Sequence, residues 1–403
     1  MGNLPFVKNT QFADVITAIA SKTKSLNQSR VVIVATTAAG YAAKDCDYLC
    51  TGENDQVVIN AAITANQGKR IALLDGTYVL GGAVTVSGNG TVLEGQGAAT
   101  IITPSNVSGT SIISIYNTGC KLKNLDIVID DLNNSITNQY ISIQGGNASE
   151  KPVVENVAIT SNIDLSITTP PQYAITSNTN TNGVVLKNLT LTGNFARGIH
   201  FSNSSNIFIE NLKINIQGGV GVLLYNDANT QTINSEITVV SNETAHAEAI
   251  WAQSGSNHSI INTKLNATST VETAPARCFR SENSSGTNVS NCEFTAVNNA
   301  PAASVVTAGF YNYNNAANYK AILQNNKFNI LPTGDTGNAS AIVLAGSCSG
   351  VISMNDFFAT KDAGGHELQT TEANIPVILP GSLTSYGTTP NGKIIAGINL
   401  TSY

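Results

Sequence analysis

Polar and apolar residues alternate in short runs along most of the chain, as in residues 121–129 (KLKNLDIVI). This period of two is typical of β-strands that bury one face. Most of these runs contain one phrase, an asparagine followed by two variable residues and a large apolar residue. The phrase starts 23 to 34 residues apart, at Asn124, Asn156, Asn188, Asn211, Asn234, Asn262, Asn291, Asn325 and Asn355.

A phrase that returns at this interval predicts a solenoid, in which each repeat packs on its neighbours. Asparagine suits a bend because it tolerates left-handed backbone dihedrals and can hydrogen-bond its own backbone or that of the next coil. We therefore expect an all-β fold, a right-handed single-stranded parallel β-helix, with an asparagine bend in every coil.

The regions on either side of the repeat predict extra parts. Residues 10–26 carry a short heptad-like seam. It fits either an ordinary amphipathic helix or a trimerising attachment helix within residues 1–30. A second helix is expected near 55–66, with Asp55 as its N-cap, covering the open end of a solenoid that spans 31–360. The repeat fails after residue 361, so 361–403 is expected to form a small C-terminal cap or to take part in trimerisation.

Three segments near the start carry a family resemblance. Residues 52–63 (GENDQVVINAAI), 70–80 (RIALLDGTYVL) and 91–97 (TVLEGQG) resemble the first turns of the pectate-lyase-like superfamily, which includes phage tailspikes. The resemblance implies a parallel β-helix. For a tailspike it also implies a homotrimer that binds a bacterial surface polysaccharide and joins other tail or baseplate proteins through its N-terminus.

Composition narrows the choice of function. Charged residues are 11% of the chain and the net charge is −6, so the basic footprint of a nucleic-acid-binding protein is missing. We see no signal peptide and no apolar run long enough to span a membrane. These features fit a phage protein that is made in the host, is carried on the virion tail and becomes extracellular after lysis.

The six cysteines do not have the spacing of a zinc site, and we expect them to be small buried side chains. Motifs for other metals or for cofactors are missing too, so none is predicted.

Counting back from each asparagine aligns residues of successive coils. Twelve positions before it stand Ile199, Val222, Ile250 and Phe279, which we expect to face inward. Eleven positions before it stand His200, Leu223, Trp251 and Arg280, and nine before it stand Ser202, Tyr225, Gln253 and Glu282. Because side chains alternate along a strand, the last two columns should form one exposed strip.

This strip predicts a polysaccharide site, with sugar rings on aromatic faces and hydroxyl groups on charged side chains. The candidate substrate-binding residues are His200, Tyr225, Trp251, Arg277 and Arg280, and the candidate catalytic carboxylates are Asp227, Glu248 and Glu282. Hydrolysis needs two carboxylates at a set separation. Lyase chemistry needs a base and a cation, which His200, His246, Arg277 and Arg280 would supply.

The motifs of calcium-dependent pectate lyases and of polygalacturonases are not found, so their catalytic residues do not carry over. We expect a tailspike-like protein that binds a bacterial surface polysaccharide, and whether it also depolymerises the glycan stays open. The alternatives are a free polysaccharide lyase, glycoside hydrolase or epimerase, and a structural virion fibre without glycan activity.

Overall fold

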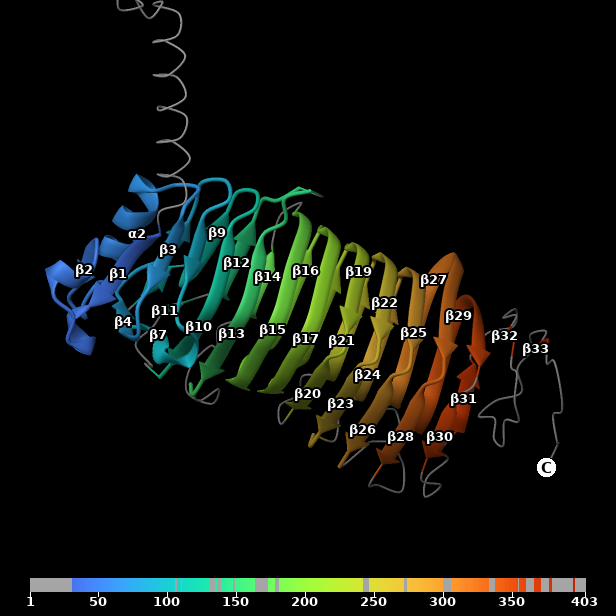
Figure 1. Ribbon diagram of the computed structural model, residues 1–403. Coiled ribbons are helices and arrows are strands. Elements are labelled where there is room, and N and C mark those ends of the chain that lie inside the picture. The colour runs from blue at the N-terminus through green and yellow to red at the C-terminus, as the bar shows by residue number, and fades with distance from the viewer. Residues whose placement is uncertain are drawn as a thin grey trace, which may run out of the picture.

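The computed structural model describes residues 31–395 except 106, 110, 131–134, 137–138, 148, 164–172, 178–180, 242–245, 272–273, 300–305, 333–337, 354, 360–365, 371–376 and 379–393. The expected N-terminal helix within residues 1–30 lies outside this part. Strands follow one another side by side along a single axis, from β1 to β31 (Figure 1). No helix of the described part is long and apolar enough to cross a membrane.

Each coil of the solenoid contributes strands to three faces, and equivalent strands of neighbouring coils pair in parallel. The first face carries the predicted strip. Its strands are β5 (Val84–Val86), β9 (Ile113–Tyr116), β12 (Gln139–Gln144), β14 (Tyr173–Ser177), β16 (Arg197–Ser202), β18 (Val220–Tyr225), β21 (Ala247–Gln253), β24 (Ala276–Glu282), the first parts of β27 (Val306–Gln324) and β29 (Asn338–Ser353), and β31 (His366–Thr370).

The second face begins with β1 (Val32–Thr36), β2 (Tyr48–Cys50), β3 (Arg70–Leu73) and β6 (Val92–Glu94). It continues through β19 (Ala228–Ile233), β22 (Ser256–Ile261), β25 (Ser285–Ser290), the second parts of β27 and β29, β32 (Val377–Ile378) and β33 (Ile394–Ile395). The third face holds β4 (Gly76–Leu80), β7 (Thr100–Pro104), β20 (Glu236–Ser241), β23 (Lys264–Ser269), β26 (Glu293–Asn298), β28 (Lys327–Pro332) and β30 (Asp356–Ala359).

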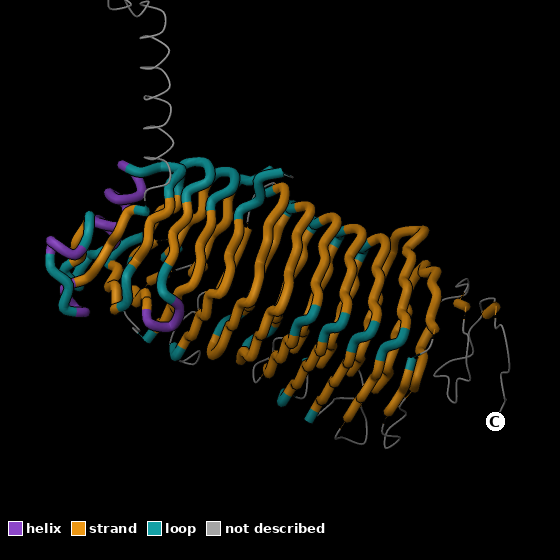
Figure 2. The backbone as a smooth tube through the Cα atoms, viewed as in Figure 1, coloured by secondary structure: helices purple, strands orange, loops and turns teal. Residues whose placement is uncertain are grey.

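Four long strands turn from the second face onto the third, and the orange tube of Figure 2 stays nearly continuous along them. They are β10 (Lys121–Ile129), β13 (Val153–Ser161), β15 (Asn182–Asn194) and β17 (Ser205–Gln217). A separate two-stranded sheet joins β8 (Ser108–Gly109) to β11 (Ser135–Ile136). Short 3-10 turns lie at η1 (Thr37–Ala39), η2 (Ala43–Asp45) and η3 (Gly97–Ala99).

Helix α2 (Gln56–Ala65) lies at the N-terminal end of the solenoid, where the sequence predicts a covering helix (Figure 1). Its apolar residues Ile59 and Ile63 are buried in the same core as the strands. Asp55 stands at the N-cap position of the helix as predicted, but its side chain makes no capping hydrogen bond. Its carboxylate instead accepts hydrogen bonds from the backbone of Gly52 and Val79, which joins the preceding loop to β4.

The core runs along the axis as stacks of apolar side chains. Phe279 and Phe310 stack with ring centroids 5.3 Å apart, and Phe294 and Phe328 do so at 4.6 Å. Four cysteines are buried and free as expected, Cys50, Cys120, Cys278 and Cys292, while Cys46 is partly exposed. Continuous burial of this kind gives the main stabilising free energy of the solenoid.

The asparagine phrase forms a ladder at the bend between the second and third faces. The asparagines at 124, 156, 188, 211, 234, 262, 291 and 325 all have φ between 49° and 55°, in the left-handed region. The predicted hydrogen bonds to backbone are replaced by bonds between side chains. Asn156 donates to Asn124 Oδ1 at 2.7 Å, and Asn211 donates to Asn188 Oδ1 at 2.9 Å.

Asn355 departs from this ladder. The register pairs Phe357 with Phe328, so Asn355 aligns with Asn326 and not with Asn325. Its side chain accepts a hydrogen bond from the Asn326 backbone and donates to Leu323 O. The ninth phrase is therefore shifted by one residue relative to the alignment that the sequence pattern predicts.

Charged side chains beside the ladder alternate in sign from coil to coil. On the second face, Glu94, Lys123, Glu155, Lys187 and Glu210 align in register. On the third face the row is Lys213, Glu236, Lys264, Glu293 and Lys327. Opposite charges on neighbouring strands stabilise one register and oppose a slip. The few charges of this chain thus hold the coils that carry the strip in alignment.

The described part of residues 361–403 consists of β31, β32 and β33, which continue the parallel pairing. Within this region the chain forms a strand from His366 to Thr370. That the region caps the solenoid stays a prediction.

Candidate functional site

The predicted columns align across the first face. Register pairing places His200, Leu223, Trp251 and Arg280 side by side and extends this column to Tyr311. A second column holds Ser202, Tyr225, Gln253, Glu282 and Tyr313, and a third holds Arg197, Val220, Glu248, Arg277 and Ala308. We call these three columns the first-face strip. The column of Ile199, Val222, Ile250 and Phe279 is buried as predicted.

Two successive inward residues in the central first-face strands set the spacing of the strip. In these strands a small residue precedes the large inward residue, and both are buried, as with Gly221 and Val222 or Ala249 and Ile250. A Cβ at Gly221 would lie 2.6 Å from Ala249 O, so this position has no room for a side chain. Two successive inward residues leave outward residues three apart, such as Arg277 and Arg280.

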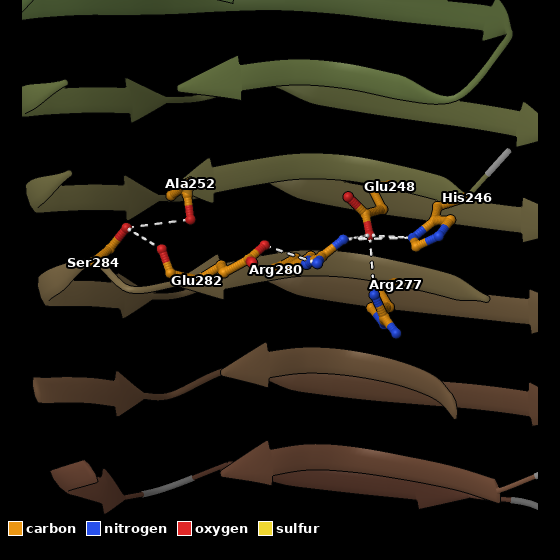
Figure 3. A network of polar contacts seen from close by, with 7 residues as sticks. All are labelled: His246, Glu248, Ala252, Arg277, Arg280, Glu282 and Ser284. Carbon is orange, nitrogen blue, oxygen red and sulfur yellow. Dashed lines mark hydrogen bonds and ion pairs between the residues drawn. The ribbon is translucent and has the colours of Figure 1, made fainter. Parts of the chain in front are cut away.

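Glu248 is the centre of a buried charge network (Figure 3). Its side chain has no exposed surface, and its Oε1 lies 3.1 Å from Arg277 Nη1 and 3.0 Å from Arg280 Nη1. His246 Nδ1 lies 3.3 Å from the same oxygen. Arg280 also pairs with Glu282, at 2.7 Å from Nη2 to Oε2, so one guanidinium lies between two carboxylates.

The protonation of Glu248 follows from these contacts. Burial alone would raise its pKa, but the hydrogen bond with His246 and the guanidinium charges of Arg280 and Arg277 outweigh burial and lower it. Glu248 is therefore an ionised partner of two arginines. A general acid for glycoside cleavage requires the opposite, a raised pKa.

Trp251, one of the expected stacking platforms, has one face of its ring covered by a charged side chain. The guanidinium carbon of Arg280 lies 4.1 Å from its ring centroid. Leu223, at the paired position of the neighbouring strand, is buried and so departs from the expected exposed column. Arg277 is also enclosed. It is only 9% exposed and its guanidinium stacks on Tyr311, 4.2 Å from the ring centroid.

The open aromatic rings of the strip are tyrosines. Tyr225 is 37% exposed and Tyr313 is 40% exposed. They stand in one register column, separated by Gln253 and Glu282. Two coils lie between the two rings, so three steps from coil to coil place the rings roughly 14 Å apart along the axis.

A second aromatic cluster lies at the N-terminal end of the strip. The rings of Tyr173 and His200 are in contact, with centroids 4.6 Å apart. Arg197 Nη1 donates a hydrogen bond to Tyr173 Oη at 2.9 Å. Burial, with a smaller effect of Arg197, lowers the pKa of His200 to about 4, so its ring is neutral near pH 7.

Asp227 is not part of the strip, which corrects the expectation that it borders the exposed surface. It is fully buried at the bend after β18, where its Oδ1 accepts a hydrogen bond from the Ser204 backbone at 2.6 Å. Burial raises its pKa to about 7, against smaller effects of the backbone at Ser204 and Tyr225. The three candidate carboxylates therefore do not converge. Only Glu248 and Glu282 are linked, through Arg280.

A shallow hollow of about 400 Å³ lies on the second face. Its charged side chains are paired, Arg70 with Glu94 and Lys123 with Glu155, both at 2.6 Å. Most of these charges belong to the alternating charge row. We therefore interpret the hollow as part of the pairing that fixes the strand register, and not as part of the candidate binding site.

Comparison with solved structures defines the fold. The A-module of Azotobacter vinelandii mannuronan C-5 epimerase AlgE6 aligns at a TM-score of 0.55 and 13% identity, over 89% of this chain and 96% of that one. The Agl-KA catalytic domain aligns at 0.52 and 14%, over 86% and 66%. The Dettilon tailspike protein aligns at 0.50 and 12%, over 78% and 64%. The chain is a parallel β-helix protein.

At these identities the likeness establishes the fold of this β-helix protein and nothing further. The chain spans about two thirds of the length of the Agl-KA domain and of the tailspike. No family model and no curated protein sequence matches the chain.

Sequence reasoning on this β-helix protein missed four residues of the first face: Tyr173, Arg197, Tyr311 and Tyr313. Arg197 stands three residues before His200, as Arg277 stands before Arg280, so the same spacing was a usable signal. The tyrosines lie in coils whose distance to the next asparagine differs from that of the central coils.

Proposed function

We propose that this chain is a tailspike-like protein that binds a bacterial surface polysaccharide along the first-face strip. The observation that supports this most is the column in which the exposed rings of Tyr225 and Tyr313 stand on either side of Gln253 and Glu282. Phage tailspikes use this fold, but the likeness covers the fold alone, so the proposal rests on the strip.

The column suits a glycan that lies along the solenoid axis. Tyrosine rings are rigid, with an apolar face for a sugar ring and a hydroxyl group for hydrogen bonding. The amide of Gln253 and the carboxylate of Glu282, between the rings, can bond sugar hydroxyl groups. Below them the Glu248 network holds Arg280 and Glu282 in place through ion pairs of 3.0 and 2.7 Å. A preorganised surface of this kind loses little entropy on binding.

Binding is favoured over hydrolysis by the state of the carboxylates. Cleavage by two carboxylates needs one proton donor at the scissile bond. Glu248 has a lowered pKa and is enclosed by two arginines, and Glu282 pairs with Arg280. Asp227, whose pKa is raised, is buried away from the strip. We therefore propose glycan binding as the function of the face and no hydrolytic role for these three residues.

The tailspike proposal also includes a homotrimer, attachment to other tail proteins through residues 1–30, and a place on the virion tail. Sedimentation equilibrium of the full chain tests the assembly. A mass three times that of the monomer is expected, and a stable monomer at micromolar concentration would contradict the trimer.

Binding is tested by titrating the protein with a panel of capsular polysaccharides and lipopolysaccharides. Changing both Tyr225→Ala and Tyr313→Ala should weaken binding by about tenfold or more, as expected for aromatic anchors. The matched control is Ile322→Ala. Ile322 is 42% exposed and also lies on β27, but in the part that belongs to the second face. Equal affinity of wild type and double variant for every polysaccharide that binds would exclude the strip as the site.

A further inference from the structure

Arg197 differs from the other two arginines of the strip in its charge environment. Arg277 and Arg280 both pair with Glu248, and Arg280 also pairs with Glu282. Within the described residues, Arg197 has no ion pair, and its contacts are with the hydroxyl group and ring of Tyr173. It therefore carries a positive charge that no described carboxylate neutralises.

Tyr173 holds this charge in place. Its hydroxyl oxygen accepts one hydrogen bond from Arg197 Nη1, at 2.9 Å. The guanidinium carbon lies 5.5 Å from the ring centroid of the same tyrosine. A guanidinium has five N–H donors, so four remain after this bond. Two parallel donors of one guanidinium match the two oxygens of a carboxylate, which makes a short and strong contact.

His200 adds a polar group beside this charge without adding a second charge. Its ring packs on Tyr173, and its Nδ1 is buried without a hydrogen-bond partner among the described residues. A buried polar atom of this kind loses free energy until it finds a partner. A neutral imidazole can give or accept one hydrogen bond, and sugar hydroxyl groups can do both.

The cluster adjoins the strip described above. His200 and Ser202 lie on the same strand, and Ser202 pairs with Tyr225 in the next coil. One glycan chain along the axis can therefore contact Tyr225 and reach Arg197 with an adjacent sugar.

We propose that Arg197, Tyr173 and His200 form a subsite for the carboxylate of a uronic acid in the bound polysaccharide. Arg197 binds the carboxylate, Tyr173 positions the guanidinium, and His200 hydrogen-bonds the same sugar. This inference rests on the proposed function and specifies its substrate class, an acidic polysaccharide.

The test uses oligomers of polygalacturonate, alginate and hyaluronan, each beside its carboxyl-reduced form. The full chain should bind at least one of the native oligomers about tenfold or more tightly than its reduced form. Arg197→Gln should weaken that binding by about ten- to a hundredfold, the range for hydrogen bonds to charged groups, and bring native and reduced oligomers to similar affinity. Arg197→Lys keeps the positive charge but loses the two parallel N–H donors of the guanidinium. Its affinity for the native oligomer should lie between those of wild type and Arg197→Gln.

The matched control is Arg70→Gln, which removes an exposed, ion-paired arginine from the second face and should leave binding unchanged. Equal thermal midpoints of the variants confirm that they are folded. Unchanged affinity of Arg197→Gln for the native oligomer would overturn the subsite. Binding of neutral polysaccharides with no preference for any acidic oligomer would overturn it too, but would leave the proposed function intact. Binding to no polysaccharide at all would refute the proposed function itself.

Discussion

Asp227 makes the stability of the solenoid depend on pH. Its carboxyl is fully buried, and burial raises its pKa from an ordinary value of 3.8 to about 7. The folded chain therefore holds a proton that the unfolded chain releases at lower pH. A raised carboxyl pKa contributes stability that is complete below the unfolded pKa and is lost as the pH rises through the folded pKa.

The size of the effect follows from the two pKa values. Each pH unit between them corresponds to 1.36 kcal/mol, so complete ionisation costs roughly 4 kcal/mol. At about pH 5 the carboxyl of Asp227 is already mostly ionised in the unfolded chain. About two pH units then separate these conditions from the folded pKa, so the Asp227 contribution should fall by roughly 3 kcal/mol between about pH 5 and about pH 8.5. Buried neutral histidines such as His200 contribute in the opposite direction, so the Asp227 contribution is measured against a variant that lacks it.

Urea unfolding of wild type and of Asp227→Asn at the two pH values measures the contribution of Asp227 to the free energy of unfolding. The asparagine keeps the Oδ1 that accepts the Ser204 N–H and cannot ionise. It should therefore remove the Asp227 contribution, so that the variant gains roughly 3 kcal/mol of stability relative to wild type between the lower and the higher pH. Glu236→Gln, which changes an exposed carboxylate in a 3.9 Å ion pair, serves as the control and should leave the dependence intact. A stability difference between wild type and Asp227→Asn that is the same at both pH values would refute a buried, proton-holding Asp227.

Two further changes test the network and the ladder. Glu248→Gln leaves Arg277 and Arg280 without their shared carboxylate, so we expect a loss of about 3–5 kcal/mol in the free energy of unfolding, and a loss below about 1 kcal/mol would contradict the pairing. Asn211→Ala puts a Cβ-bearing residue without a side-chain amide at φ 52°, and should cost roughly 1–2 kcal/mol in the same assay. Asn211→Gly should recover part of this loss, and an equal loss in both variants would show that backbone strain is not its cause.

The asparagine pattern was a sufficient guide to the coils of the strip. The coils that end at Asn211 and Asn234 are equal in length, and those that end at Asn262 and Asn291 are longer. In these two, the additional residues fall in the sequence between β20 and β21 and between β23 and β24, which is before the first-face strand. Counting back from the asparagine therefore passes only through segments of constant length. For this reason the spacing of the residues alone was enough to predict the columns of His200 and Tyr225.

The same count failed where residues are inserted between the strip and the asparagine. The register between β27 and β29 shifts between Asn314 and Tyr319. This shift moves Tyr311 and Tyr313 out of the positions that the count predicts. The pattern shows that the coil is longer, but it cannot show on which side of the strip the added residues lie.

Burial of the carboxylates was the other failure. Charged residues are almost never fully buried unless they are paired, so Asp227 and Glu248 were expected near the surface. Glu248 is compensated by arginines that follow it by 29 and 32 residues, on the next coil. Asp227 instead has a raised pKa and accepts a hydrogen bond from a backbone N–H. Neither arrangement can be read from the residues beside them in the chain.

The most direct test of the polysaccharide site is a crystal structure of the full chain with an oligosaccharide prepared from a polysaccharide that it binds. Our account predicts sugar density along the first face, with rings against Tyr225 and Tyr313 and hydroxyl groups within hydrogen-bond distance of Gln253 and Glu282. Sugar density on the second or third face, with this strip empty, would contradict it.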